Sequence, residues 1–209
     1  MHDTEDAARA RRPDHRCLFE IASEQGGYFT AAQAAGCGFS RASLSYHARR
    51  GRFLRVRRGL YRLAEYPSSP HEDLLAAWLA AGRGDAVVSH ESALELLGLS
   101  DVIPDRIHLT VPRSKRYRPA GQGVAIHTTT RPLRPTDVLT RDGLPVTSPA
   151  RSIVDAAEAG TGPDQVVKAA REAVERGLAT KTQLLAEAQG RGGRVERLIQ
   201  RALDEVEAP

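Results

Sequence analysis

Residues 40–63 have the sequence SRASLSYHARRGRFLRVRRGLYRL, and this stretch decides the fold of the N-terminal part of the chain. Its first half predicts a helix. The hydroxyl of Ser40 can accept a hydrogen bond from a free backbone amide of the first helical turn, as an N-cap residue does. Leu44 and Ala48 are one turn apart, so we expect them to face inward while polar residues up to Arg50 face outward.

The second half of the stretch predicts a β-hairpin. Apolar and basic residues alternate there, as they do in strands that bury one face. A turn that contains glycine, at residues 58–59, separates the two strands. On this pattern we expect Leu54 and Val56 to pack on the helices. We expect Arg55 and Arg57 to point outward.

Two shorter helices precede this stretch. Apolar residues at helical spacing predict a first helix over about 14–25, and Thr30 can cap a second helix over 31–35. A glycine-containing turn joins the second helix to the helix over 40–50. Two short helices around such a turn are the sequence form of a helix-turn-helix, and the basic hairpin that follows is the wing. We therefore predict a winged helix-turn-helix.

Charge is distributed unevenly along the chain. No acidic residue occurs between Glu24 and Glu65, whereas this segment contains eight arginines. Residues 1–66 carry twelve arginines and seven acidic residues, a net charge of +5, and the rest of the chain carries −1, which together give the +4 of the whole protein. Each phosphate that an arginine neutralises releases condensed counterions, so such a surface favours nucleic acid. The pattern indicates a nucleic-acid-binding domain joined to a nearly neutral domain with another role.

The outer face of the helix over 40–50 and the wing supply the expected DNA contacts. In a helix-turn-helix, the N-terminal part of this helix approaches base edges in the major groove, where the arginine fork matches two acceptors of guanine. We expect base contacts from Arg41, Ser43, Ser45 and Tyr46. We expect phosphate contacts from Arg49, Arg50, Arg55, Arg57 and Arg58. The alternative is a solvated basic surface, but the absence of interspersed acidic residues favours DNA.

The remainder of the chain predicts a second domain. Residues 67–70, Pro-Ser-Ser-Pro, can form a short stiff linker between a domain of residues 1–66 and one of residues 71–209. Alternating strands, the clearest at 106–111 and 124–129, combine there with helices that extend to the C-terminus. We therefore predict an α+β fold, in which a winged helix-turn-helix precedes a mixed α/β domain with a small antiparallel or mixed sheet and C-terminal helices.

The loop between these two strands is a second basic patch with an aromatic residue inside it. It can contact DNA or an acidic partner, or it is a solvated and flexible loop. Its basic residues are Arg113, Lys115, Arg116 and Arg118.

The sequence contains no recognisable catalytic or cofactor site. His90-Glu91 begins like the helix of a zinc protease, but position 94 is Leu where the second metal ligand belongs. His108 and His127 lie on neighbouring predicted strands as a pair at most, without the third ligand that zinc needs. A metal-dependent nuclease needs clustered carboxylates, and the two clearest strands contain no Asp or Glu. We therefore expect no enzyme activity, no metal and no cofactor.

Cys17 and Cys37 do not form a CxxC pair, and no export signal is evident at the N-terminus. We therefore expect both to be reduced thiols with a structural role. The longest apolar run, residues 74–81, is too short to span a bilayer. These features predict a cytoplasmic protein without a membrane partner.

Four segments of the chain resemble AbiEi-family antitoxins, the antitoxin half of bacterial type IV toxin–antitoxin systems. They are residues 53–63, 88–94, 107–112 and 143–151. The resemblance implies a winged helix that binds operator DNA and represses its own operon, with a C-terminal domain that contributes to antitoxicity. It also implies a toxin partner that resembles a nucleotidyltransferase, counteracted through direct contact or through the target of the toxin. The chain lacks the Gly-Ser and Asp-x-Asp motifs of such a toxin, so it resembles the antitoxin.

Two other functions fit the residues. One is a nuclease or other nucleic-acid-processing enzyme whose winged helix delivers the substrate, for which magnesium-dependent cleavage is the test. The other is a stand-alone transcription factor whose second domain senses a ligand or forms dimers. A neighbouring gene for a nucleotidyltransferase-like protein favours the antitoxin instead. Repressors often bind paired half-sites, which allows for two copies of the protein on one operator.

Overall fold

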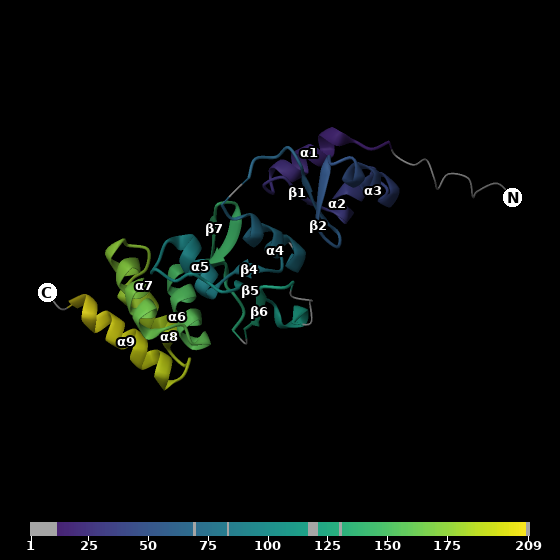
Figure 1. The fold of residues 1–209 in the computed structure, drawn as a ribbon. Coiled ribbons are helices and arrows are strands. Elements are labelled where there is room, and N and C mark those ends of the chain that lie inside the picture. The colour runs from purple at the N-terminus through teal and green to yellow at the C-terminus, as the bar shows by residue number, and fades with distance from the viewer. Residues whose placement is uncertain (1–11, 69, 83, 117–120, 130, 208–209) are drawn as a thin grey trace. The chain divides into compact units, whose positions relative to one another are not determined.

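The chain forms two compact units in the computed structural model, Met1–Ala80 and Ala81–Pro209 (Figure 1). The first unit contains a three-stranded sheet and the second a five-stranded sheet. Both combine their sheet with helices, so the predicted α+β fold class is confirmed. The structure describes residues 12–68, 70–82, 84–116, 121–129 and 131–207.

The first unit is a winged helix-turn-helix. Its helices are α1 (His15–Ser23), α2 (Ala31–Gly36) and α3 (Arg41–Arg49). Its strands are β1 (Tyr28–Thr30), β2 (Phe53–Arg57) and β3 (Leu60–Leu63), which pair antiparallel in the order β1-β3-β2. The β2–β3 hairpin is the wing that the sequence predicts, and β1 adds a third strand at its side.

Each of these three helices begins at a residue whose side chain caps it. The Asp14 carboxylate accepts hydrogen bonds from two backbone amides of the first turn of α1, both at 3.0 Å. Thr30 and Gln33 form a reciprocal capping box at the start of α2. Ser40 Oγ accepts from the Ser43 amide at 3.1 Å at the start of α3. Such caps satisfy amides that have no partner within the helix, and each contributes about 1 kcal/mol.

One apolar cluster forms the core between the three helices and the sheet. Its buried members are Leu18, Ala22, Phe29, Ala34, Cys37, Phe39, Leu44 and Phe53. Tyr61 on β3 packs against this cluster, and its ring stacks on that of Phe29 with centroids 5.8 Å apart. The cluster therefore fixes α3 and the wing on one scaffold.

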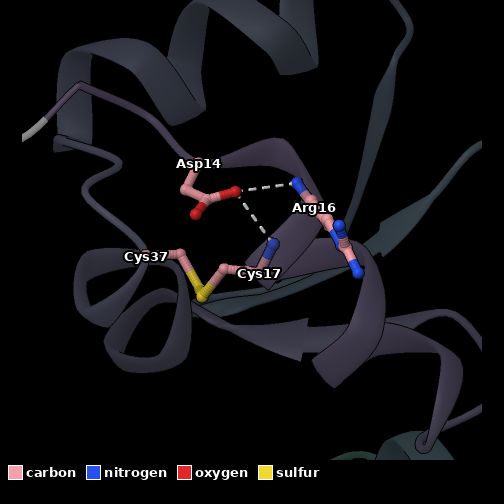
Figure 2. Close-up of a disulfide and its surroundings, with 4 residues drawn as sticks. All are labelled: Asp14, Arg16, Cys17 and Cys37. Atoms are coloured by element: carbon pink, nitrogen blue, oxygen red, sulfur yellow. Dashed lines mark hydrogen bonds between the residues drawn. A yellow bond between two sulfur atoms is a disulfide. The ribbon is translucent and has the colours of Figure 1, made fainter.

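A disulfide joins Cys17 on α1 to Cys37 at the end of α2, with the two Cα atoms 5.8 Å apart (Figure 2). The prediction of two reduced thiols is therefore wrong. The two residues are 20 positions apart in the sequence, and they meet because α1 and α2 pack around the same core. Figure 2 also shows the Asp14 cap beside this bond. The first turn of α1 is therefore restrained by both the disulfide and the hydrogen bonds to Asp14.

The wing differs from the prediction in which side chains it exposes. Phe53, opposite Leu63, is the buried residue of β2, whereas Leu54 and Val56 are 46% and 40% exposed. The prediction that these two pack on the helices is wrong. The strand does not alternate strictly, because Leu54, Arg55 and Val56 are all exposed. An irregularity in the pairing between Arg55 and Arg57 shifts the register toward the tip.

The second unit is built on a mixed sheet with the strand order β6-β5-β4-β8-β7. Its strands are β4 (Val87–Val88), β5 (Ile107–Val111), β6 (Val124–Thr128), β7 (Val138–Arg141) and β8 (Leu144–Thr147). The pairs β5–β6 and β4–β8 are parallel, and the pairs β4–β5 and β7–β8 are antiparallel. Asp142 and Gly143 both have positive φ, 49° and 77°, as the two-residue turn of the β7–β8 hairpin requires.

Helices cover this sheet and form the C-terminal part of the unit (Figure 1). They are α5 (His90–Leu97), α6 (Pro149–Ala159), α7 (Pro163–Glu175), α8 (Lys181–Ala188) and α9 (Gly193–Glu207), with short 3-10 turns at Arg113–Lys115 and Pro135–Asp137. The helix α4 (Glu72–Gly82) contains the division between the units. Leu94, Ile153 and Ile199 are completely buried, and each contributes about 1.5 to 3 kcal/mol by burial. None of the described helices has the length and apolarity needed to cross a lipid bilayer.

Candidate nucleic-acid interface

The outer face of α3 carries most of the predicted base and phosphate contacts. Leu44 and His47 face the core, and the side chains on the opposite face are exposed. The exposed predicted residues are Arg41, Ser45, Tyr46, Arg49 and Arg50. An exposed face of this kind at the third helix is the part of a helix-turn-helix that enters the major groove.

Ser43 is the exception among the four predicted base contacts. Its side chain is half-buried, and its hydroxyl donates a hydrogen bond to the Ser40 carbonyl at 2.9 Å. The hydroxyl is therefore engaged in the first turn of α3 and offers its oxygen only as an acceptor. Position 43 lies at the edge of the exposed face of α3.

Tyr46 and Arg50 interact with each other on this face. The guanidinium of Arg50 lies over the Tyr46 ring, 5.5 Å from its centroid. A cation–π contact of this kind contributes about 0.5 to 1 kcal/mol at an exposed site. It restrains two long side chains before any ligand binds, which lowers the entropy lost on binding.

His47 belongs to the core and was not among the inward residues expected from the sequence. Its ring is buried against Phe53, with centroids 4.9 Å apart, and next to His15 at 5.1 Å. Burial lowers the pKa of His47, and the charges of His15 and Arg52 act in the same direction. The buried side of α3 therefore contains a neutral imidazole at neutral pH.

The wing continues the basic surface. Arg55 and Arg58 are exposed, and Arg57 is half-buried. Arg52, which precedes β2, is also exposed and was missed as a candidate contact. The exposed Leu54 and Val56 lie between these arginines in the sequence, so the wing presents apolar as well as charged groups.

Within the part of the chain that the structure describes, no carboxylate forms an ion pair with seven of the arginines in this segment. They are Arg41, Arg49, Arg50, Arg52, Arg55, Arg57 and Arg58. A phosphate that approaches them has no internal partner to displace. This arrangement keeps the cost of binding a polyanion low.

Arg62 differs from the other arginines of the segment. It is 7% exposed and donates hydrogen bonds to the carbonyls of Tyr66 and Pro67 and to Glu72, the last at 2.7 Å. The expectation that it belongs to the basic surface is wrong. Its position on β3 opposite Leu54 directs it to the side of the hairpin where the chain continues to α4.

The second predicted basic patch is described only in part. Arg113 and Arg116 are exposed at the 3-10 turn after β5, and Lys115 lies 3.5 Å from the carboxylate of Asp85. Arg118 lies outside the described residues. Arg116 donates a hydrogen bond to the Arg113 carbonyl at 3.2 Å, within the same turn.

Sequence reasoning missed a buried ionic network in the second unit. Arg151 on α6 is 3% exposed and binds Asp155 at 2.8 Å, and Arg191 binds Asp155 and Glu187 at 2.8 and 2.7 Å. Asp137, at the end of the 3-10 turn Pro135–Asp137, is a further buried carboxylate. Burial by itself raises the pKa of Asp137, but hydrogen bonds from Arg134 outweigh this effect, so the pKa lies below its usual range. The network ties α6 to the segment that connects α8 and α9. The helical spacing of Arg151 and Asp155 was the one local signal for it.

The second unit also adds a third histidine to the predicted pair. His108 Nδ1 on β5 lies 3.0 Å from His127 Nε2 on β6, because these strands pair in parallel. His90, the first residue of α5, stacks on His127 with ring centroids 3.6 Å apart. The expectation that His108 and His127 form only a pair is therefore wrong, because β4 and α5 bring His90 to the same place.

Comparison with known proteins gives two matches to family models. Residues 18–64 match a model described as a transcriptional regulator, AbiEi antitoxin. Residues 86–205 match a model described as an AbiEi antitoxin C-terminal domain. Among curated proteins none matches the chain.

The fold is also found in a solved structure, that of the RV2827C protein from Mycobacterium tuberculosis. The TM-score is 0.65 at 21% sequence identity, over 93% of this chain and 77% of that one. At this identity the similarity concerns the fold. It extends over both units, so the order of a winged helix and a mixed α/β domain is common to the two proteins.

Proposed function

The chain belongs to the AbiEi family of antitoxins, and from this premise we propose that it is the antitoxin of a bacterial type IV toxin–antitoxin system and represses its own operon. The general role of antitoxin and transcriptional regulator follows from the family. The proposal adds the operator as the DNA target and a nucleotidyltransferase-like toxin as the protein that is counteracted. Such a repressor acts where its operon is, in the cytoplasm, and it has no catalytic role.

One observation supports the DNA-binding part of the proposal above all others. Seven arginines on α3 and the wing have no carboxylate partner among the described residues, in a domain with the fold of a DNA-binding module. We assign base contacts to Arg41, Ser43, Ser45 and Tyr46. We assign phosphate contacts to Arg49, Arg50, Arg55, Arg57 and Arg58. Arg113, Lys115, Arg116 and Arg118 are a second, weaker candidate surface.

The proposal divides the chain by function. Residues 1–66 bind the operator, residues 67–70 link the two parts, and residues 71–209 carry the antitoxin activity. Two copies of the protein can occupy paired half-sites of one operator. Operator binding and antitoxicity are then separable by substitution.

A binding assay with the full-length protein tests the DNA target. Fluorescence anisotropy compares a duplex from the protein's own promoter with a shuffled duplex of the same composition, over a series of salt concentrations. We expect the promoter to bind about a thousandfold more tightly or better, as specific DNA-binding proteins do. Equal affinity for both duplexes would contradict the proposal.

Substitutions refine this assay. Arg41→Ala should weaken binding and reduce the preference for the promoter, whereas Arg57→Ala should weaken binding to both duplexes alike. Arg171→Ala, an exposed arginine on α7, is the matched control and should leave both affinities unchanged. If Arg171→Ala weakens binding as much as Arg57→Ala does, net charge accounts for the binding and the α3–wing surface does not.

Co-expression tests the antitoxin part. The chain is expressed with the product of the neighbouring gene, and rescue of growth is scored. We expect rescue by the wild type and by Arg57→Ala, because the substitution lies in the DNA-binding part. Absence of rescue by the wild type refutes the antitoxin assignment, and loss of rescue only in Arg57→Ala refutes the separation of the two functions.

A further inference from the structure

Three histidines from separate elements of the second unit form one cluster. One side-chain nitrogen of each of His90, His108 and His127 lies within 4.8 Å of the others. The shortest of these distances is the 3.0 Å between His108 Nδ1 and His127 Nε2. Two nitrogens that bind one zinc ion at 2.0 to 2.1 Å in tetrahedral geometry are about 3.3 Å apart. The pair on β5 and β6 is therefore already at the separation of neighbouring metal ligands.

The cluster is held by the backbone around it. The parallel register of β5 and β6 places Thr110 opposite His127. His108 lies two residues before Thr110 on β5, so its side chain is on the same face of the sheet as that of His127. His90 has a φ of +54°, in the left-handed region that non-glycine residues rarely adopt. Such a conformation is strained for a residue with a side chain and is found preferentially at functional sites. It sets the direction in which His90 leaves the start of α5.

The surroundings favour uncharged imidazoles, the form that binds metal ions. Burial, together with the nearby His127, His108, Arg151 and Arg191, lowers the pKa of His90 to about 2. Burial likewise lowers the pKa of His127 to about 4. Arg151 and Arg191 are themselves paired with carboxylates, so their charges are largely offset.

Further polar groups surround the three rings as second-layer partners. His90 Nδ1 is 2.9 Å from Ser89 Oγ, which also accepts a hydrogen bond from Thr110 Oγ1 at 2.8 Å. A side-chain nitrogen of His108 lies within 4.8 Å of carboxylate oxygens of Glu91 and Asp105. His108 Nε2 is buried and has no hydrogen-bond partner among the described residues. A hydroxyl bonded to a ring nitrogen, as Ser89 Oγ is to His90, orients a histidine ligand in metal sites.

A cavity of about 360 Å³ adjoins the cluster, with His90 and His127 in its wall. Asp155 and Glu158 also line it, together with Arg131, Arg151 and Arg191. Water in the cavity can complete the coordination of an ion that has three protein ligands. The stack of His90 on His127 has to open by rotation of the His90 ring about its second side-chain torsion, which is a soft one.

We propose that His90, His108 and His127 bind one divalent transition-metal ion, with three neutral imidazoles as ligands and water from the cavity as a fourth. Such a ligand set suits zinc best among the abundant metals, since imidazole is a preferred ligand and three histidines with water form a common zinc site. The ion joins β5, β6 and the start of α5, so it stabilises the second unit and does not depend on the winged helix.

The test is titration of the full-length protein, freed of metal by a chelator, with zinc and with cobalt. We expect one zinc ion per chain and visible ligand-field bands of four-coordinate cobalt without thiolate charge-transfer bands. His90→Gln, His108→Gln and His127→Gln should each lower zinc affinity by at least about tenfold, since even loss of outer-shell partners costs 10- to 100-fold. Circular dichroism verifies that each variant is folded.

His15→Gln is the matched control, because His15 and His47 form another close pair, with ring centroids 5.1 Å apart in the first unit. It should leave zinc affinity unchanged. Nitrogen-15 spectra of the wild-type imidazoles provide a test without substitutions, and one equivalent of zinc should shift the resonances of His90, His108 and His127 together. Absence of stoichiometric binding, or binding that persists in all three glutamine variants, overturns the proposal.

Discussion

The disulfide between Cys17 and Cys37 permits a quantitative prediction about the winged helix. The bond closes a loop between residues 20 positions apart. In the chain-entropy description, the disulfide restricts the unfolded chain, and loss of the bond gives the unfolded state more conformational entropy. For a loop of this length, the loss lowers the stability of the folded unit by about 3 kcal/mol. Reduction should therefore lower the free energy of unfolding of the first unit by about this amount, and should leave the second unit unaffected because it contains no cysteine.

Hydrogen exchange followed by mass spectrometry measures both units in one sample. Peptides from α1 and β1 report on the disulfide-linked core, and peptides from α6 serve as the internal control. A loss of 3 kcal/mol corresponds to a little over a hundredfold faster exchange of the most protected amides, since each 1.4 kcal/mol is a factor of ten. Exchange in α6 should not change.

The double variant Cys17→Ala/Cys37→Ala should reproduce the effect of reduction without added reductant. Agreement between the two separates the loss of the bond from other effects of the reductant. The reasoning is refuted if reduction accelerates exchange in α1 and β1 less than about threefold. It is also refuted if α6 responds as strongly as α1.

Three further predictions concern the interface, the core of α3 and the ionic network. Arg49→Ala should reduce the slope of log affinity against log salt concentration by about one unit in anisotropy titrations, since one phosphate contact is lost. Burial lowers the pKa of His47, so its imidazole should titrate by NMR below the ordinary value of about 6.5. The unfolded state then binds the proton at a higher pH than the folded state does, so the stability of the winged helix falls as the pH drops below about 6.5. A titration midpoint at or above about 6.5 contradicts this account. Asp155→Ala should destabilise the second unit by about 3 to 5 kcal/mol in urea denaturation, because Arg151 and Arg191 lose a buried partner, and a change below about 1 kcal/mol would show that solvent compensates them.

Local patterns in the sequence were enough to predict the winged helix. Ser40 and Thr30 cap helices by binding amides only three residues away. The two strands of the hairpin are adjacent in the sequence on either side of the turn. The absence of acidic residues from 25 to 64 likewise needs no coordinates, since it leaves the arginines without carboxylate partners nearby in sequence. These signals also supported the family resemblance that the comparisons confirm.

The site in the second unit could be predicted only in part. His108 and His127 stand out on two alternating strands, and their neighbourhood followed from adjacent strands in the chain. His90 offered no such signal, because its approach depends on β4 lying next to β5 and on the backbone conformation at the start of α5. The partners of Arg151 other than Asp155 could not be predicted either, because they come from distant parts of the chain.

The sequence by itself determined the helices, the hairpin, the basic segment and the α+β class, because hydrogen bonds and periodicity within a few residues specify them. Only the tertiary structure decided that Cys17 bonds to Cys37, that Arg62 turns away from the other arginines, and that three histidines meet. These features depend on contacts between residues distant in the chain or on strand register. In the wing, alternation by itself did not indicate that Phe53 is the buried residue of β2, because its burial depends on the core that the helices and the sheet form together.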